Sequence, residues 1–195
     1  MSISDIKRIV NSQKMYDDTH KNIEEARKSA IKLCRSYNKL VNDDSVYDQT
    51  ILEQLLGHIG KQAFIESNFR CEFGFNIYIG DNVYINHDMI ILDCNEVRIG
   101  NDVYIGPRVG IYTGNHAEDP IERADGGVYA KPVTIGDKVW LCGDVKIAQD
   151  VTIGENSIIG MGSVVLNDIP PNVLAAGNPC KVIRPIKESD VRWHK

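Results

Sequence analysis

The sequence predicts an all-β solenoid with a helical segment in front of it and one loop projecting from it. An aliphatic residue recurs at every sixth position over long stretches, residues 1–58 follow a helical spacing instead, and one polar stretch interrupts the six-residue period. A period of six fits neither an amphipathic helix nor a flat strand alone. Such self-similarity is typical of repeat proteins, in which each unit buries its apolar face against the next.

The clearest repeats begin at Ile135 and run without a break to Pro170. They read IGDKVW, LCGDVK, IAQDVT, IGENSI, IGMGSV and VLNDIP, so Ile, Leu or Val leads every hexad. The same pattern occurs at 79–90 and 99–110. We expect a triangular coil of three short strands whose leading aliphatic side chains point inward, each contributing about 1.5–3 kcal/mol on burial.

The residue after each leading aliphatic is often Gly, and we expect it to supply the turn through a φ angle near or above zero. The stretch 91–98 is two residues longer than a hexad, which predicts a bulge or corner. Residues 112–132 are polar, and the hexads resume in phase after them, so this segment is predicted to be a protruding functional loop. The β-helix and a C-terminal strand are predicted to occupy 59–186, followed by a short tail at 187–195.

Residues 1–58 are predicted to form a helical segment that caps the open end of the coil stack. Asp44 or Ser45 is the expected N-cap of its last helix, and Gly57 or Gly60 is its expected end. The longest helix has apolar residues at helical spacing with charged residues opposite. Its predicted buried face consists of Ile23, Ala26, Ala30, Leu33, Tyr37 and Leu40.

Composition narrows the class of protein. The 22 basic and 27 acidic residues give a formal net charge of −5, which argues against a general nucleic-acid or anionic-membrane surface. The N-terminal stretch lacks a signal-peptide layout and no apolar run approaches membrane-spanning length, so we expect a cytoplasmic protein. No two cysteines have zinc-ligand or redox spacing, and all are expected to be small buried residues in a reducing compartment. They are Cys34, Cys71, Cys94, Cys142 and Cys180.

Five stretches carry a resemblance to a known family: KMYDD at 14–18, NIYIGDNVYINHD, IGPRVGIYTGNHAEDPIER, YAKPVTIGDKVW and IIGMGSVVLNDIPPNVLAAGNPCKVI. Together they make nearly the whole chain similar to the maltose and galactoside O-acetyltransferases among the hexapeptide-repeat transferases. The hexads indicate only the fold, whereas the NH pair in the loop and the AAGNPCKVIR ending are more specific. The resemblance implies a left-handed β-helix, acetyl-CoA as co-substrate without a required metal, a small sugar acceptor, and a homotrimer with active sites between subunits.

Two residues are predicted to take part in catalysis. His116, in TGNHAEDP, matches the family's catalytic histidine, and a histidine suits a general base because its pKa lies near neutrality. Asn86, in YINHD, matches an asparagine that contacts the acceptor and the reacting centre, where its amide could stabilise an oxyanion. Without the resemblance, His116 would be interpreted as a solvated loop histidine and Asn86 as a turn residue. The neighbouring His87 is expected to be a surface residue.

The remaining site residues also come from the resemblance. The predicted acceptor-binding residues are Asp18, Glu72, Asn86 and Asp93. The galactoside-specific pattern has a serine at the position of Glu72 and an acidic residue at that of Cys94, so maltose, glucose and galactosides all stay open. The predicted acetyl-CoA contacts are Trp140, Gly143, Met161, Leu166, Asn167, Lys181 and Arg184. Lys181 stands where the family commonly has arginine, and Leu166 replaces a usual threonine.

Three alternatives compete with a sugar acetyltransferase. A γ-type carbonic anhydrase also uses hexapeptide coils but needs three converging histidines. An acyltransferase of the same fold could act on a different acceptor: a nodulation-type oligosaccharide, serine or an antibiotic. A non-catalytic scaffold would need neither the loop histidine nor a cationic C-terminal strand. The first is disfavoured because no close pair lies on the coils among His20, His58, His87, His116 and His194.

Overall fold

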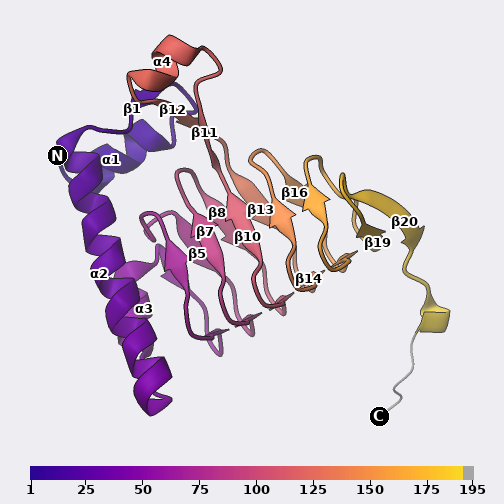
Figure 1. Ribbon diagram of the computed structural model, residues 1–195. Helices are drawn as coiled ribbons and strands as arrows, with labels where there is room; N and C mark the ends of the chain where they lie inside the picture. The colour runs from indigo at the N-terminus through magenta and orange to yellow at the C-terminus, as the bar shows by residue number, and fades with distance from the viewer. Residues whose placement is uncertain (191–195) are drawn as a thin grey trace.

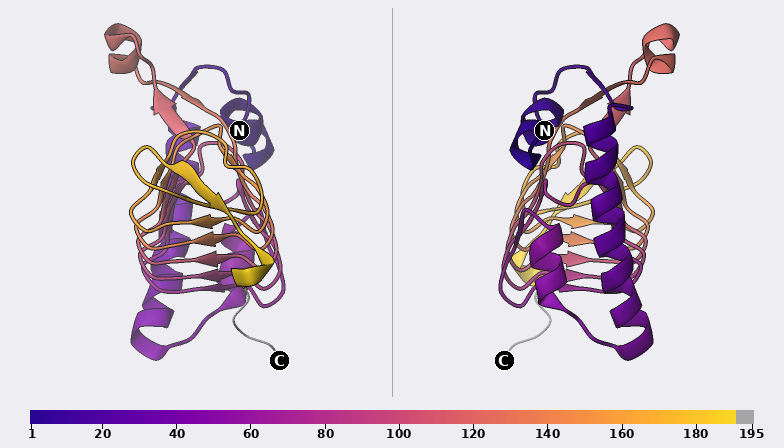
Figure 2. Two further views of the ribbon diagram at one scale, coloured as in Figure 1. Left: turned by 90° about the vertical axis from the view of Figure 1, so that its right-hand side faces the viewer. Right: turned by 90° about the vertical axis from the view of Figure 1, so that its left-hand side faces the viewer.

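A computed structural model describes residues 1–190 of the chain. It is a left-handed parallel β-helix of about 6 turns, with helices at its N-terminal end and an antiparallel strand at its C-terminal end (Figure 1). The coil is a three-sided prism, as the hexads predicted. Viewed along its axis, the stacked coils enclose one core (Figure 2).

Each side of the prism is one sheet, and its strands pair in parallel with the same side of the next coil. The first face contains β2 (His58–Ile59), β5 (Ile77–Ile79), β8 (Val97–Ile99), β13 (Val133–Ile135) and β16 (Thr152–Ile153). The second face contains β3 (Phe64–Ile65), β6 (Tyr84–Ile85), β9 (Tyr104–Ile105), β14 (Trp140–Leu141), β17 (Ile158–Ile159), β19 (Val173–Ala176) and the antiparallel β20 (Lys181–Pro185). The third face contains β4 (Arg70–Cys71), β7 (Ile90–Leu92), β10 (Gly110–Tyr112), β15 (Lys146–Ile147) and β18 (Val164–Val165).

The leading aliphatic residues of the hexads form the core, which confirms the predicted inward face. Those of the four complete repeat coils are at most 4% exposed. They belong to one continuous apolar cluster that also includes Tyr37 and Leu52 of the N-terminal helices. The residues are Ile79, Ile85, Ile91, Ile99, Ile105, Ile111, Ile135, Leu141, Ile147, Ile153, Ile159 and Val165.

The expectation that the second residue of a hexad supplies the turn is wrong. The positive φ falls two residues later, for example at Asn82, with φ 57°, and at Asn156, with φ 55°. The second-position glycines are required because neighbouring coils approach closely. A Cβ on Gly136, for instance, would lie 2.6 Å from the backbone nitrogen of Glu155 in the next coil.

We therefore expect Gly136→Ala to lower the free energy of unfolding by about 1–3 kcal/mol, because the added methyl forces two coils apart. Guanidinium unfolding followed by circular dichroism measures this. Gly143→Ala is the matched control, since its Cβ would meet its nearest atom at 3.4 Å, an ordinary contact. Equal stability of the two variants would contradict the close-approach explanation.

The helical segment covers the N-terminal end of the prism and contains α1 (Ile3–Val10), α2 (Lys21–Asp44) and α3 (Gln49–Leu55). The predicted α2 face is largely confirmed, and Cys34 and Val41 are also buried on it. The predicted N-cap of the last helix is wrong, because Asp48 caps α3 by accepting the N–H of Thr50. The helix ends at Leu55, and Gly57, one of the two predicted ends, directly follows the C-cap Leu56. Ser45 instead ends α2 in a left-handed conformation.

Residues 112–132 contain regular structure rather than an irregular loop. β11 (Gly114–His116) and β12 (Gly127–Ala130) form an antiparallel hairpin, with α4 (Pro120–Ala124) between them. β1 (Tyr16–Asp17), from the N-terminal segment, adds to the other edge of β12 (Figure 1). A short 3-10 helix, η1 (Glu188–Asp190), lies in the predicted tail, and residues 191–195 lie outside the described chain. No helix within residues 1–190 has the length and apolarity to cross a membrane.

Candidate active site

Three segments far apart in sequence meet below the hairpin. They line a cavity of about 130 Å³ with Asp18, Glu72 and His116. The strand register explains the arrangement, because β12 pairs with β1 on one side and with β11 on the other. His116 lies opposite Val128, and the N–H of Asp18 donates to the carbonyl of Gly126 at 3.1 Å. Three of the predicted site residues are therefore brought together within one chain.

His116 lies at the end of β11, and its side chain is exposed. Among residues 1–190 its imidazole makes no hydrogen bond. A ring nitrogen is thus accessible at the mouth of the cavity. The position suits a base that must receive a proton from a bound molecule.

Sequence reasoning missed Arg27, which ties the two acidic residues of the cavity together. Its guanidinium lies 2.7 Å from Asp18, also forms an ion pair with Glu72, and covers the ring of Phe73 at 5.7 Å. Burial lowers the pKa of Arg27, but the two carboxylates outweigh it and the net change is upward. The signal in the sequence was a cation four residues after the buried Ile23 on the long helix. Two carboxylates therefore line the cavity, and Arg27, which is not among the lining residues, fixes both of them.

Asp93, predicted to bind an acceptor, has a different place in the structure. It is 0% exposed, and its carboxylate accepts the backbone N–H groups of Glu72 and Phe73 at 2.9 Å and of Asn76 at 3.3 Å. Burial raises its pKa to about 6, although these hydrogen bonds favour the charged form. Asp93 has no exposed surface with which to contact an acceptor. We reassign it to the corner between the third and first faces, where it supports Glu72.

Cys94 lies at the next position of the same corner and lines the cavity. Burial, followed by the nearby Glu72 and Asp93, raises the pKa of its thiol to about 12. The thiol is therefore neutral near pH 7, and a neutral thiol is a poor nucleophile. Cys94 is therefore a poor candidate for the nucleophile of a covalent intermediate.

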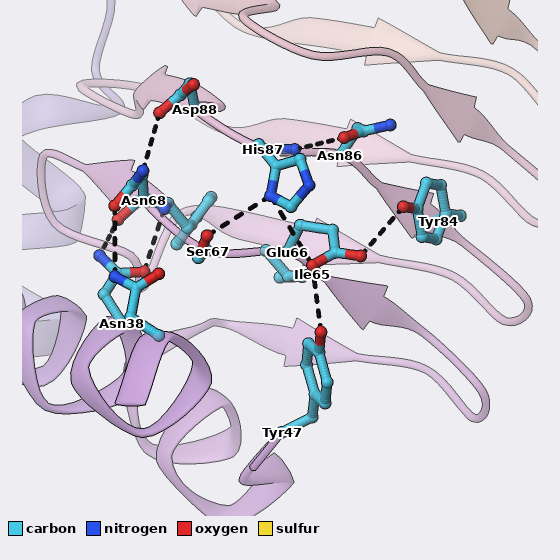
Figure 3. Close-up of polar contacts among 12 residues, drawn as sticks. Asn38, Tyr47, Ile65, Glu66, Ser67, Asn68, Tyr84, Asn86, His87 and Asp88 are labelled. Carbon is cyan, nitrogen blue, oxygen red and sulfur yellow. Dashed lines mark hydrogen bonds and ion pairs between the residues drawn. The ribbon is translucent and has the colours of Figure 1, made fainter. Parts of the chain in front are cut away.

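Asn86 is not part of this cavity. It lies between β6 and β7, at the edge between the second and third faces, and strand β7 separates it from the cavity, which begins at Leu92. Its Oδ1 accepts the N–H of His87 at 2.8 Å (Figure 3), so its amide nitrogen is left as an outward donor. The positive φ of this turn belongs to Asp88 (63°). Residue 86 does not have to adopt a left-handed φ angle. Tolerance of that conformation therefore does not explain why this residue is an asparagine.

A polar cluster supports the edge beside Asn86 (Figure 3). The carboxylate of Glu66 accepts the hydroxyls of Tyr47 and Tyr84, both at 3.1 Å, and lies 3.7 Å from Nδ1 of His87. His87 is exposed, as predicted for a surface residue. Through Glu66, the cluster links the coil next to Asn86 to the preceding coil and to Tyr47.

The predicted acetyl-CoA residues occupy the C-terminal half of the prism. Trp140 (48% exposed), Gly143 and Met161 (77% exposed) lie on or next to the same edge as Asn86, in later coils. The backbone N–H of Cys180 donates to Val164, which brings Lys181 to that edge. Leu166 and Asn167 lie across the third face, after β18. Arg184 is engaged with Asp190 at 2.7 Å.

No set of three His, Cys, Asp or Glu side chains within residues 1–190 is arranged to hold a metal ion. A triangular β-helix with a histidine-bearing hairpin and a cationic terminal strand defines the class of hexapeptide-repeat transferases. Residues 132–167 match the bacterial transferase hexapeptide (six repeats), and residues 11–60 match the maltose acetyltransferase hexapeptide capping motif.

Comparison with known proteins identifies the family within this class. The chain is 35% identical to the galactoside O-acetyltransferase of Escherichia coli over 95% of this chain and 91% of that protein. It superposes with a TM-score of 0.89 on a maltose O-acetyltransferase from Clostridium difficile (43% identity; 93% and 97% covered). A galactoside acetyltransferase in complex with coenzyme A also gives 0.89 (34% identity; 100% and 96% covered). The chain belongs to the maltose and galactoside O-acetyltransferase family of hexapeptide-repeat transferases.

Proposed function

We propose that this protein transfers an acetyl group from acetyl-CoA to a hydroxyl of a small sugar. The observation that carries the proposal is the cavity in which His116 meets Asp18 and Glu72. Carboxylates accept hydrogen bonds from sugar hydroxyls, and a neighbouring imidazole takes the proton of one of them. Membership in the sugar O-acetyltransferase family supports the same reaction.

In the proposed mechanism His116 removes the proton from the acceptor hydroxyl as its oxygen attacks the thioester carbon. The carbonyl oxygen becomes an oxyanion, and the amide nitrogen of Asn86 donates a hydrogen bond to it. Collapse breaks the carbon–sulfur bond, and His116 returns the proton to the departing sulfur. Arg27 holds Asp18 and Glu72 in place, so that both carboxylates present acceptor oxygens to the sugar.

The separation of Asn86 from His116 leads us to propose that the complete site forms between two copies of the chain. A cavity of about 130 Å³ is small beside the roughly 300–1,000 Å³ of ordinary ligand sites. A neighbouring copy that brings its Asn86 edge to the hairpin would enlarge and complete it. The homotrimer implied by the resemblance provides such an arrangement, and a cytoplasmic location belongs to the same proposal.

Lys181 is proposed to bind a phosphate of acetyl-CoA. Its ammonium forms no ion pair among residues 1–190, in contrast to Arg184. We expect Lys181→Ala to raise the KM for acetyl-CoA by about 10–100-fold, the loss of one charged hydrogen bond. Steady-state kinetics at saturating acceptor measures it, with Lys187→Ala as the control for an exposed lysine in the tail. An unchanged KM would remove Lys181 from the cofactor site.

The function is tested by thiol release from acetyl-CoA against a panel of glucose, maltose, galactosides and glucosamine. Release that depends on one sugar supports the proposal and identifies the acceptor. Thiol release that occurs only with a non-sugar hydroxyl or amine would support acetyl transfer but contradict a sugar as the acceptor. Failure to bind acetyl-CoA, measured by calorimetry, would favour a non-catalytic scaffold.

A further inference from the structure

The fold brings together two cysteines that are far apart in sequence. Cys34 lies on α2 and Cys71 ends β4, and their Sγ atoms are 3.5 Å apart. Both are reduced and almost buried, at 6% and 9% exposure. A disulfide has a sulfur–sulfur distance of about 2.05 Å, so bond formation requires the two atoms to close by about 1.5 Å.

Hydrogen bonds near the two thiols hold helix α2 against the first coil. One turn after Cys34, the side-chain amide of Asn38 donates to the carbonyl of Phe69 at 2.9 Å and accepts its N–H at 3.1 Å. The hydroxyl of Tyr37 donates to the carbonyl of Ile65 at 2.5 Å. Helix α2 is thus fixed against the first coil within one turn after Cys34 (Figure 3 shows Asn38 at this contact). The fold itself therefore places the two cysteines next to each other.

The pair opens onto a surface groove of about 720 Å³ that both cysteines line. The groove also carries Arg35, Lys39 and Arg70, and none of the described side chains that line it is acidic. The hydrogen bond between the two thiols lowers the pKa of Cys34, whereas the same bond, together with burial, raises the pKa of Cys71 well above its ordinary value. The roles therefore differ, because the thiolate is the nucleophile in thiol chemistry.

We propose that Cys34 and Cys71 form a redox modification site, at which a hydroperoxide links α2 to β4 through a disulfide. The thiolate of Cys34 attacks the terminal peroxide oxygen, the O–O bond breaks, and an alcohol or water leaves with the thiol proton. The resulting sulfenic acid is attacked at sulfur by Cys71, which gives the disulfide and expels water. Two thiols are oxidised by two electrons and one hydroperoxide is reduced.

The modification bears on the acceptor cavity, a consequence that rests on the proposed function. Cys71 directly precedes Glu72, and Arg27, which binds Glu72, lies on the same helix as Cys34. The disulfide draws together the two elements that hold the cavity carboxylates. We expect the KM for the sugar to change several-fold on oxidation, with the KM for acetyl-CoA unchanged.

The test treats the native protein with hydrogen peroxide and follows thiol number, mass and peptide map, none of which depends on activity. We expect a loss of two of the five thiols, a mass decrease of about 2 Da and a linked Cys34–Cys71 peptide, all reversed by dithiothreitol. The unfolding midpoint of the oxidised protein should rise by roughly 5–10 °C, because the link restrains the unfolded chain. Cys34→Ala and Cys71→Ala should each abolish these changes.

Cys142→Ala is the matched control. Within residues 1–190, Cys142 is half-buried whereas the other four cysteines are buried, and it should not be needed for the link. Three outcomes would overturn the proposal: oxidation confined to Cys142, a sulfinic acid on Cys34 without a link, or no thiol loss under conditions that oxidise the unfolded chain. If either alanine variant fails to fold, the peptide map of the wild-type protein alone decides. A linked peptide without any change in the KM for the sugar would support the modification site but contradict its proposed effect on the cavity.

Discussion

His116→Ala is expected to lower kcat for acetyl transfer by roughly 10²–10⁴-fold, the usual contribution of a positioned general base. The imidazole is exposed at the mouth of the cavity that Asp18 and Glu72 also line, and nothing in its position contributes to the core. The variant should therefore fold normally and bind acetyl-CoA with little change. Steady-state thiol release and calorimetric binding measure the two quantities separately.

His58→Ala provides the control, because His58 is an exposed histidine of β2 on the first face. It should keep nearly full activity. A His116→Ala variant with wild-type kcat would show that another group accepts the hydroxyl proton. A variant that loses acetyl-CoA binding instead would show that His116 acts in substrate binding.

Asp93→Ala is expected to lower the free energy of unfolding by about 3–6 kcal/mol. It leaves the three buried N–H groups of Glu72, Phe73 and Asn76 without an acceptor, at roughly 1–3 kcal/mol each. Denaturant unfolding measures the loss. Asp81→Ala is the control, since Asp81 accepts one exposed N–H, from Lys61, and should cost at most about 1 kcal/mol. A loss for Asp93→Ala no larger than that of Asp81→Ala would contradict the corner role.

The same residue predicts a pH dependence. In the folded chain the pKa of Asp93 is raised from 3.8 to about 6, so the folded state binds this proton more tightly than the unfolded chain. Its contribution to stability therefore falls as the pH rises from about 4 to 6, by about 3 kcal/mol, and is constant above that range. The difference in unfolding free energy between wild type and Asp93→Asn should change by this amount across the window. A pH-independent difference would contradict the raised pKa.

Much of the fold was predictable because the hexad is a local pattern. Every coil repeats the same burial requirement, so Ile135 and its equivalents indicate the inward face without knowledge of distant contacts. The long helix was recognisable for the same reason. The N-cap of the last helix was not, because Asp48 and Ser45 both suit a cap and only the path of the chain selects between them.

The candidate site was predicted in part through the resemblance. His116, Asp18 and Glu72 were named from motifs, and the structure brings them to one cavity. Arg27 was missed because its role depends on two carboxylates, one of which is 45 residues away. Asp93 was misassigned because a motif position does not reveal whether a carboxylate faces the ligand or the backbone of its own corner.

By itself the sequence determined the period of the coil, the identity of the buried aliphatic residues and the position of the interrupting hairpin. These depend on spacing along the chain. Only the tertiary structure decided which distant groups meet: Arg27 with Glu72, Cys34 with Cys71, and His116 apart from Asn86. The physical reason is that a solenoid converts sequence separations of about twenty residues into neighbouring coils, while the cap and the hairpin fold back across it.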